Sequence, residues 1–260
     1  MRRIIIAATA VAALVFAAAA YAAITNTYTA SFTWNQSGAG TAKKPVTLGF
    51  TENLGAANMT AGMPAEPLTD IKITASGIKT NYKYFTTTCS AAKIIAAKND
   101  TVCPKGALIA TGTVTATLYP QATPSEQTPC NPVLDVWNGG GGQLNFYFVI
   151  SGGHECGGLQ TGETNPYTAT IANSGGGIVQ NTPLPPDVST EAGNLPGTYG
   201  ALTNEVLKWS KLTVKVKGKT IPFLESTGCP GGSRSYPVAF TATDVAGDTA
   251  TSSVAGKSKC

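Results

Sequence analysis

Hydrophobic and polar residues alternate with a period of two along much of the chain. In residues 28–34, which read YTASFTW, apolar side chains occupy one set of alternate positions and hydroxyl side chains occupy the other. The alternation recurs in residues 46–50, 71–75, 110–118 and 212–216. Because successive side chains of a strand point to opposite faces, the pattern predicts a series of half-buried β-strands.

Turn residues separate these segments. In residues 132–150, two apolar runs flank NGGGG at 138–142, which is typical of a β-hairpin. Residues 236–243 and 249–254 predict another hairpin at the C-terminus. Only two short segments, 91–98 and 204–209, favour helix. About ten short strands with turns between them predict an all-β fold: a single disulfide-stapled antiparallel β-sandwich, immunoglobulin-like or jelly-roll-like, with one or two short helices.

Residues 182–198, TPLPPDVSTEAGNLPGT, interrupt the pattern because they are rich in Pro and Gly and lack periodicity. We interpret them as a surface loop within one domain of residues 23–260. The alternative is a linker between two β domains, 23–181 and 199–260. We favour one domain because the four or so strands after the loop would make a thin core on their own.

The first 22 residues have a different pattern. Arg2 and Arg3 precede an apolar run over residues 4–20, which ends in Ala20-Tyr21-Ala22. This arrangement predicts a secretory signal peptide over residues 1–22, with a membrane anchor as the alternative. No later apolar stretch is long enough to span a bilayer, so the sequence predicts a secreted or extracellular protein, with cell-surface association left open.

Composition narrows the partners further. The chain has a formal net charge of +4, and loss of Arg2 and Arg3 with the signal peptide lowers it to +2. So small a charge does not favour a nucleic-acid partner. With nucleic acid disfavoured, the sequence leaves an envelope glycan or a protein surface as the possible partner. We expect no transmembrane segment in the mature chain.

Six cysteines follow the signal peptide. In an oxidising compartment an even number of cysteines predicts disulfides, and pairing of sequence neighbours is the simplest arrangement. We find no C-x-x-C redox motif, and a single His does not support a zinc site. The cysteines are therefore interpreted as three staples. They are Cys89 with Cys103, Cys130 with Cys156, and Cys229 with Cys260.

No residue is assigned to catalysis, to a metal or to a cofactor from the sequence. His154 lies beside Glu155 in GGHECGG, but adjacent residues of an extended segment point to opposite faces. We therefore interpret this segment as a loop that carries a disulfide. The carboxylates are scattered along the chain, and a glycosidase pair that forms only on folding remains an alternative.

Two pairs of residues are candidates for ligand contact. Tyr82 and Tyr84 lie in KTNYKYF and are expected to be the most exposed of the aromatic residues. The three tryptophans are interpreted as core residues because they fall on apolar faces. Lys215 and Lys217 lie in a lysine-rich segment and, in a strand, would project from one face. We interpret that face as exposed to solvent, or as an edge strand whose lysines prevent edge-to-edge aggregation. The alternative is a surface that contacts an acidic envelope polymer.

Several motifs resemble those of a group of exported, β-rich bacterial proteins. They are C-x-A-A-x-I and C-P-K-G-x-L-I-x-x-G within residues 88–116, E-S-x-G-C-P within residues 225–243, and the terminal Cys260. The resemblance implies export and a β-rich fold. It brings no catalytic residues that could be transferred to this chain.

Two classes of function follow. The first is a non-enzymatic secreted or cell-surface module that binds a ligand or has a structural role. The alternative is a secreted hydrolase that acts on glycans through a carboxylate pair formed on folding. A carboxylate pair in a deep cleft would favour the hydrolase, and the lone His with no nucleophile motif favours the binding module.

Overall fold

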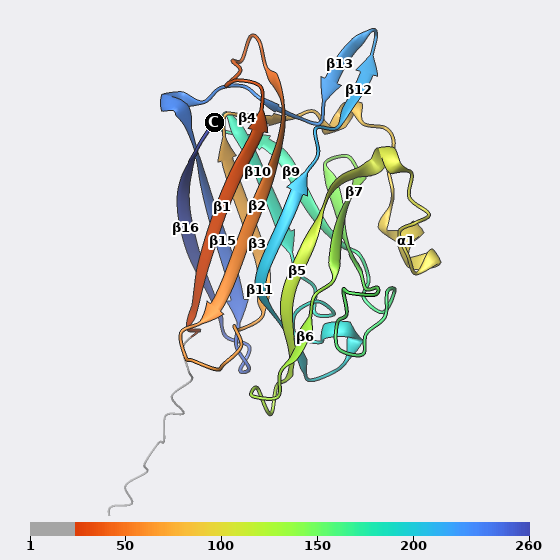
Figure 1. Cartoon of the computed structure of the whole chain (residues 1–260), viewed down its shortest axis with the longest axis vertical. Coiled ribbons are helices and arrows are strands. Elements are labelled where there is room, and N and C mark those ends of the chain that lie inside the picture. The colour runs from red at the N-terminus through yellow and green to blue at the C-terminus, as the bar shows by residue number, and fades with distance from the viewer. Residues whose placement is uncertain (1–23) are drawn as a thin grey trace, which may run out of the picture.

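The computed structural model describes residues 24–260 and consists mostly of long β-strands (Figure 1). Strands make up 56% of the structure and helices 8%, which confirms the all-β prediction. The predicted signal peptide at residues 1–22 lies outside the described residues.

The strands follow one another with short connections. The first half of the chain contains β1 (Asn26–Gln36), β2 (Val46–Asn58), β3 (Leu68–Ser76), β4 (Ile78–Thr80), β5 (Leu108–Pro120), β6 (Thr128–Cys130) and β7 (Val133–Gly140). The second half contains β8 (Gln143–Val149), β9 (Tyr167–Ser174), β10 (Gly177–Pro183), β11 (Thr198–Trp209), β12 (Thr213–Val216), β13 (Lys219–Pro222), β14 (Leu224–Ser226), β15 (Ser233–Thr243) and β16 (Thr249–Lys259). The hairpin predicted around residues 138–142 is confirmed as β7 and β8.

Most strands belong to one continuous antiparallel sheet. Its order is β16-β15-β3-β10-β9-β8-β7-β5-β11-β2-β14-β4, with β1 added to β2 and β6 added to β5. The short hairpin β12–β13 stands apart from it and projects at one end of the molecule (Figure 1). The pairing is continuous, so the division into two sheets that defines a sandwich stays a prediction.

The sheet bends back on itself and encloses the core. Strands β1 and β16, which lie far apart in the pairing order, run close together (Figure 1). Tyr28 of β1 stacks on Phe240 of β15, with their ring centroids 4.5 Å apart. Trp209 of β11 is buried and stacks on Phe50 of β2 at 5.2 Å. The inward side chains of opposite parts of the sheet therefore share one hydrophobic core.

The three disulfides pair sequence neighbours, as predicted. They join Cys89 to Cys103, Cys130 to Cys156, and Cys229 to Cys260. Three disulfides in one chain indicate an oxidising, extracellular environment. Within residues 24–260, no helix has the length and apolar character needed to cross a membrane.

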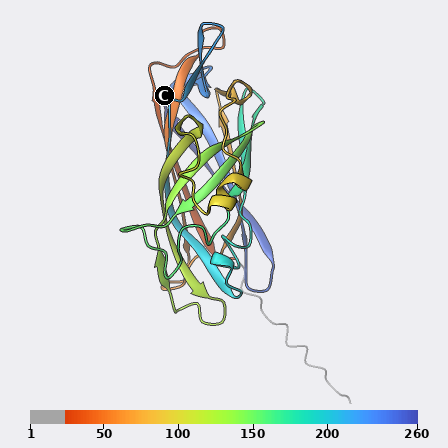
Figure 2. The same ribbon diagram turned by 90° about the vertical axis from the view of Figure 1, so that its right-hand side faces the viewer.

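Helix α1 (Ala91–Ala97) confirms the helix predicted at residues 91–98. The Ser90 side chain caps it by accepting a hydrogen bond from the Lys93 backbone N–H. Ile94 is fully buried beneath the helix, against the outer surface of β7 and β8. Figure 2, which faces this side, shows α1 lying over these two strands. We call residues 85–107, which include α1 and the Cys89–Cys103 disulfide, the flap.

The helix predicted at residues 204–209 is wrong, because these residues are the end of strand β11. The pairing of β11 with β5 shifts between Leu202 and Asn204. Such a bulge adds one unpaired residue and turns the following side chains to the other face. The break in alternation hides the strand in the sequence.

Strands from both sides of the Pro/Gly-rich segment share the sheet. Residues 184–197 form a loop with one short 3₁₀ helix, η3 (Ala192–Asn194). Beyond the loop, β11 inserts between β2 and β5, and later β15 pairs with β3. This insertion brings inward side chains of β2, β5 and β11 together, which matters for the site below.

Candidate functional site

The aromatic candidates do not form an exposed pair. Tyr82 and Tyr84 lie in a short 3₁₀ helix, η1 (Tyr82–Tyr84). Tyr82 is half-buried and packs against the core, whereas Tyr84 is 37% exposed. The Lys83 Nζ lies 5.4 Å from the centre of the Tyr84 ring. Only one ring therefore faces the solvent, which is a small surface for a sugar or peptide.

The two lysine candidates lie on the projecting hairpin. Lys215 is exposed on β12, but β12 ends at Val216. Lys217 lies in the following turn with a φ of +49°. The prediction that both side chains project from one face of a strand is therefore wrong, because the turn at Lys217 and Gly218 ends the strand first.

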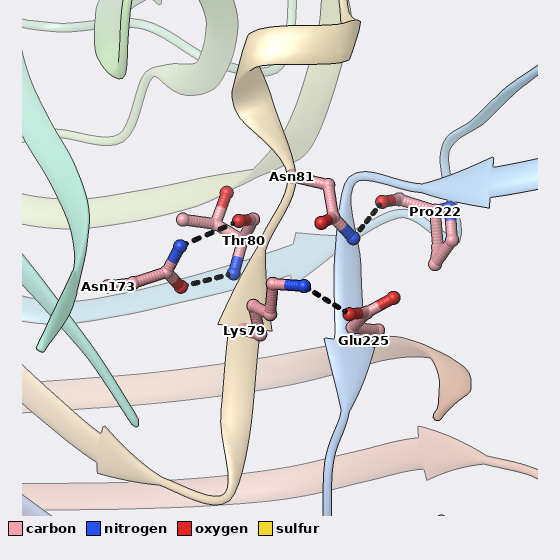
Figure 3. Close-up of polar contacts among 6 residues, drawn as sticks. All are labelled: Lys79, Thr80, Asn81, Asn173, Pro222 and Glu225. Atoms are coloured by element: carbon pink, nitrogen blue, oxygen red, sulfur yellow. Dashed lines mark hydrogen bonds and ion pairs between the residues drawn. The ribbon is translucent and has the colours of Figure 1, made fainter. Parts of the chain in front are cut away.

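An open cleft lies near the base of this hairpin, where three elements are tied together (Figure 3). Asn81 Nδ2 donates a hydrogen bond to the Pro222 carbonyl at 3.1 Å. The Asn173 side chain accepts from the Thr80 N–H and donates to the Thr80 carbonyl, at 2.8 and 2.9 Å. Lys79 Nζ lies 3.2 Å from Glu225 Oε1.

The cleft has a volume of about 420 Å³, and its lining includes the glycine-rich turn at residues 174–177. Among the described residues, no aromatic ring lines it. Its one cation and one carboxylate already pair with each other. The cleft therefore offers hydrogen bonds but neither a stacking surface nor an unpaired charge.

A second space lies inside the folded sheet. It is a partly open cavity of about 80 Å³. Apolar side chains from several strands supply most of its wall. They include Leu54 of β2, Ile71 of β3, Val114 of β5, Phe146 of β8 and Leu202 of β11. Walls that are mainly apolar favour the apolar part of a ligand at this place.

Two loops close one end of the cavity, and we call them together the cap: residues 150–166 and 184–197. Leu159 of the first loop and Ala192 of the second are buried and line the cavity. Asn194 Nδ2 donates to the Glu163 carbonyl at 2.7 Å, and the Asn165 N–H donates to Asp187 Oδ2 at 3.1 Å. The two loops therefore form one hydrogen-bonded lid.

Covalent and steric constraints hold the cap in place. The disulfide between Cys130 and Cys156 ties the first loop to β6. Gly193 in the second loop has a φ of +69° and lies against Leu159, where a Cβ atom would overlap the leucine side chain. Glycine is needed there for both the conformation and the close approach.

Two acidic side chains enter this apolar cavity. Glu52 lies on β2 and Glu205 on β11, and only 1% and 8% of their surfaces are exposed. In the antiparallel register Glu52 faces Leu207, and Glu205 faces Leu54, so the two glutamates are diagonal neighbours on the inner face. Diagonal positions lie roughly 7–8 Å apart, which long side chains bridge.

Burial dominates the acid–base chemistry of this pair. It raises the pKa of Glu52 well above its usual range, and the neighbouring Glu205 carboxyl raises that pKa further. Burial likewise raises the pKa of Glu205 to about 7. Close carboxyls without a counter-ion do not both ionise readily. At neutral pH the pair therefore retains at least part of one proton.

Sequence analysis missed this pair, although a signal was present. Phe50, Glu52 and Leu54 are alternate residues, so the charge falls within an apolar face. The same holds for Glu205 before Leu207 and Trp209. A charge at an inward position of a strand is unusual and often marks a functional site.

The remaining candidates stay apart. His154 lies in the first cap loop, with its Nδ1 3.2 Å from the Asn131 carbonyl. Across residues 24–260, no three His, Cys, Asp or Glu side chains gather in a way that could hold a metal ion. Glu52 and Glu205 in the cavity are therefore the candidate functional side chains.

Comparison of the chain with protein-family models, with curated proteins and with solved structures finds no match. The resemblance to exported bacterial β-rich proteins stays a prediction. The choice between a binding protein and a glycan hydrolase therefore rests on the side chains that line the cavity and the cleft.

Proposed function

We propose that this chain is a secreted or cell-surface binding protein without catalytic activity, built as a single β-sandwich. In this proposal the interior cavity takes up the slender apolar part of a small ligand. The observation that carries the proposal is the mainly apolar cavity beneath the cap. Binding sites for small molecules are typically concave and mostly apolar, with a few polar groups that fix orientation.

The size of the cavity limits the ligand. Its volume of about 80 Å³ exceeds the roughly 10–15 Å³ that one water needs, and it is about half of the roughly 150 Å³ cavity that accepts benzene. A short unbranched alkyl group fits this range better than a ring. Pockets for drug-sized ligands are larger, at roughly 300–1,000 Å³.

The carboxyl pair supports binding over glycan hydrolysis. Glycosidases place two carboxyl groups on either side of a sugar, about 5–9.5 Å apart, within a cleft that admits the substrate. Here the two glutamates come from neighbouring strands and share one face of the sheet. The cavity that they line, at about 80 Å³, is too small to hold an oligosaccharide between them.

Isothermal titration with n-alkanols of two to eight carbons tests the proposal. We expect binding that strengthens with chain length and then stops once the cavity is full. Ala116→Leu, which places a larger side chain on the cavity wall, should abolish binding. Ala250→Leu on the exposed face of β16 is the matched control and should bind as the wild type does.

Two results would contradict the proposal. One is the absence of binding for every alkanol to a protein whose near-ultraviolet circular dichroism shows native packing. The other is turnover in a glycosidase panel that disappears in both Glu52→Gln and Glu205→Gln.

A further inference from the structure

We infer that the polar end of the ligand is a primary ammonium group, held by Glu52 and Glu205 while its alkyl part fills the cavity. This inference rests on the proposed function, because it names the class of ligand that the same cavity accepts. Three independent features of the cavity lead to it: the sign of its charges, its open hydrogen-bond acceptors, and its shape.

The first feature is charge. The ionisable side chains that line the cavity are Glu52, Glu205, Asp187 and Tyr167. Within the described part of the chain, no Lys, Arg or His side chain lines it. The buried carboxyl pair thus has no cation of its own, and a buried charge is costly unless it is paired. A cationic group supplied by the ligand provides that partner.

The second feature is unused hydrogen-bonding capacity. Glu52 is 99% buried, and its Oε2 atom makes no hydrogen bond of normal geometry, although the nearby Trp209 indole partly offsets the rise in pKa that burial gives this carboxyl. The Thr164 Oγ1 on the cap is also buried without a partner. Most buried polar atoms in proteins have partners, and among the buried side-chain atoms without one in residues 24–260 only these two belong to side chains that line the cavity. An ammonium group carries three N–H donors, which suits convergent oxygen acceptors.

The third feature is the combination of a narrow apolar space with a single acidic end. An n-alkylammonium ion matches both parts at once. An alkyl carboxylate has the same tail, but it places a third negative group beside two carboxyls, and repulsion between like charges opposes that arrangement. An alkanol fits the tail and makes one hydrogen bond but brings no charge.

The proton balance gives the inference a pH dependence. The ammonium group keeps its proton, since an alkyl amine resembles a lysine side chain with a pKa near 10.4. The carboxyl pair must carry one negative charge to receive it. Two other ionisable side chains line the cavity. Asp187 accepts a hydrogen bond from the Asn165 N–H at the cap. Burial raises the pKa of Tyr167 well above its usual range, so its phenol stays neutral.

Below a pH of about 7, binding therefore requires the pair to release a proton. The affinity for an alkylammonium ion should then fall by up to about tenfold for each pH unit. The affinity for an alkanol, which binds without a change in charge, should change far less over the same range.

The test is a comparison of n-butylamine, n-butanol and butanoate by isothermal titration at pH 8 and pH 5. At pH 8 we expect butylamine to bind at least tenfold more tightly than butanol, and butanoate not to bind. At pH 5 the advantage of the amine should be lost. Glu52→Gln/Glu205→Gln should remove the preference for butylamine over butanol at pH 8. Glu126→Gln, at an exposed position, is the control.

The outcomes separate the two proposals. If butanol binds but butylamine binds no better at pH 8, or if butanoate binds equally well, the ammonium inference is overturned while the cavity remains a binding site. If none of the three compounds nor any longer alkanol binds to the folded protein, the proposed function itself is wrong. Retention of the amine preference in the double Gln variant also overturns the inference, because the preference then arises elsewhere.

Discussion

At the scale of single residues, the sequence reveals which side chains are inside better than it reveals what they do there. The tryptophans were expected in the core, and Trp137 and Trp209 are indeed buried. Scattered acidic residues gave no indication that Glu52 would meet Glu205. Their contact depends on β11 pairing with β2, across about 150 residues of chain, and a register of that range is not encoded in local periodicity.

A second acidic pair lies beneath the flap and leads to a residue-scale prediction. Asp100 is buried and accepts a hydrogen bond from Trp137 Nε1 at 3.0 Å. Burial, together with the neighbouring Asp100 carboxyl, raises the pKa of Asp135 to about 6. The native state therefore favours protonated Asp135, and this contribution to stability is present below a pH of about 4 and lost as the pH rises through about 6.

We therefore expect Asp135→Asn to raise the thermal midpoint at pH 8 by about 2–4 °C and to leave it unchanged at pH 4. Differential scanning calorimetry at both pH values measures this. Asp248→Asn, in an exposed turn, serves as the control. A shift of equal size at both pH values would show that the effect does not come from ionisation.

At the scale of elements, the sequence predicted secondary structure correctly where the residues of one segment determine its conformation. Helix α1 has a Ser N-cap and a disulfide around it, and it was predicted correctly. Strand β11 was mistaken for a helix because its bulge changes which side chains face inward. Gly200 and Leu202 line the cavity before the bulge, and Glu205 lines it afterwards. Alternation alone does not reveal a strand that changes face.

The flap provides the element-scale prediction. Besides the bond from Trp137 to Asp100, its tertiary hydrogen bonds include Asn145 Nδ2 to the Cys89 carbonyl and the Cys89 N–H to the Asn138 carbonyl, both 2.8 Å. Cys89→Ser/Cys103→Ser opens a loop of about 15 residues and should lower the free energy of unfolding by roughly 3 kcal/mol. Denaturant titration measures this loss, and hydrogen exchange should show residues 85–107 losing protection first.

Cys229→Ser/Cys260→Ser is the matched control, since it removes the same kind of bond at another place. It should weaken the end of β16 and leave the flap protected. If both double variants expose the flap equally, the flap is held by the global stability of the sheet rather than by its own disulfide.

At the scale of the whole molecule, the buried carboxyls act together. Burial raises the pKa of Glu52, Glu205, Asp135, Glu66 and Asp70. Each of these groups binds a proton more tightly in the native state than in the unfolded chain. Stability therefore falls as the pH rises through their native pKa values, because the unfolded state binds fewer protons there.

The free energy of unfolding should thus be larger at pH 4.5 than at pH 8. Urea titrations at half-unit pH steps measure the trend. Glu52→Gln/Glu205→Gln should flatten the part of the curve between pH 5 and pH 8. A stability maximum at pH 8 in the wild type would contradict this prediction and would mean that these carboxyls are ionised at no cost in the native state.

The cap leads to a prediction about how quickly the proposed ligand exchanges. In the proposed binding function, the ligand passes these two loops as it enters and leaves, so we expect their separation to limit the exchange rate in both directions. Asn194→Gly removes the bond to the Glu163 carbonyl while keeping a residue that tolerates the positive φ of 60°. Stopped-flow measurements with n-butanol should show entry and exit accelerated by the same factor, with an unchanged dissociation constant. Unequal acceleration would mean that Asn194 acts on the bound state rather than on the passage to it.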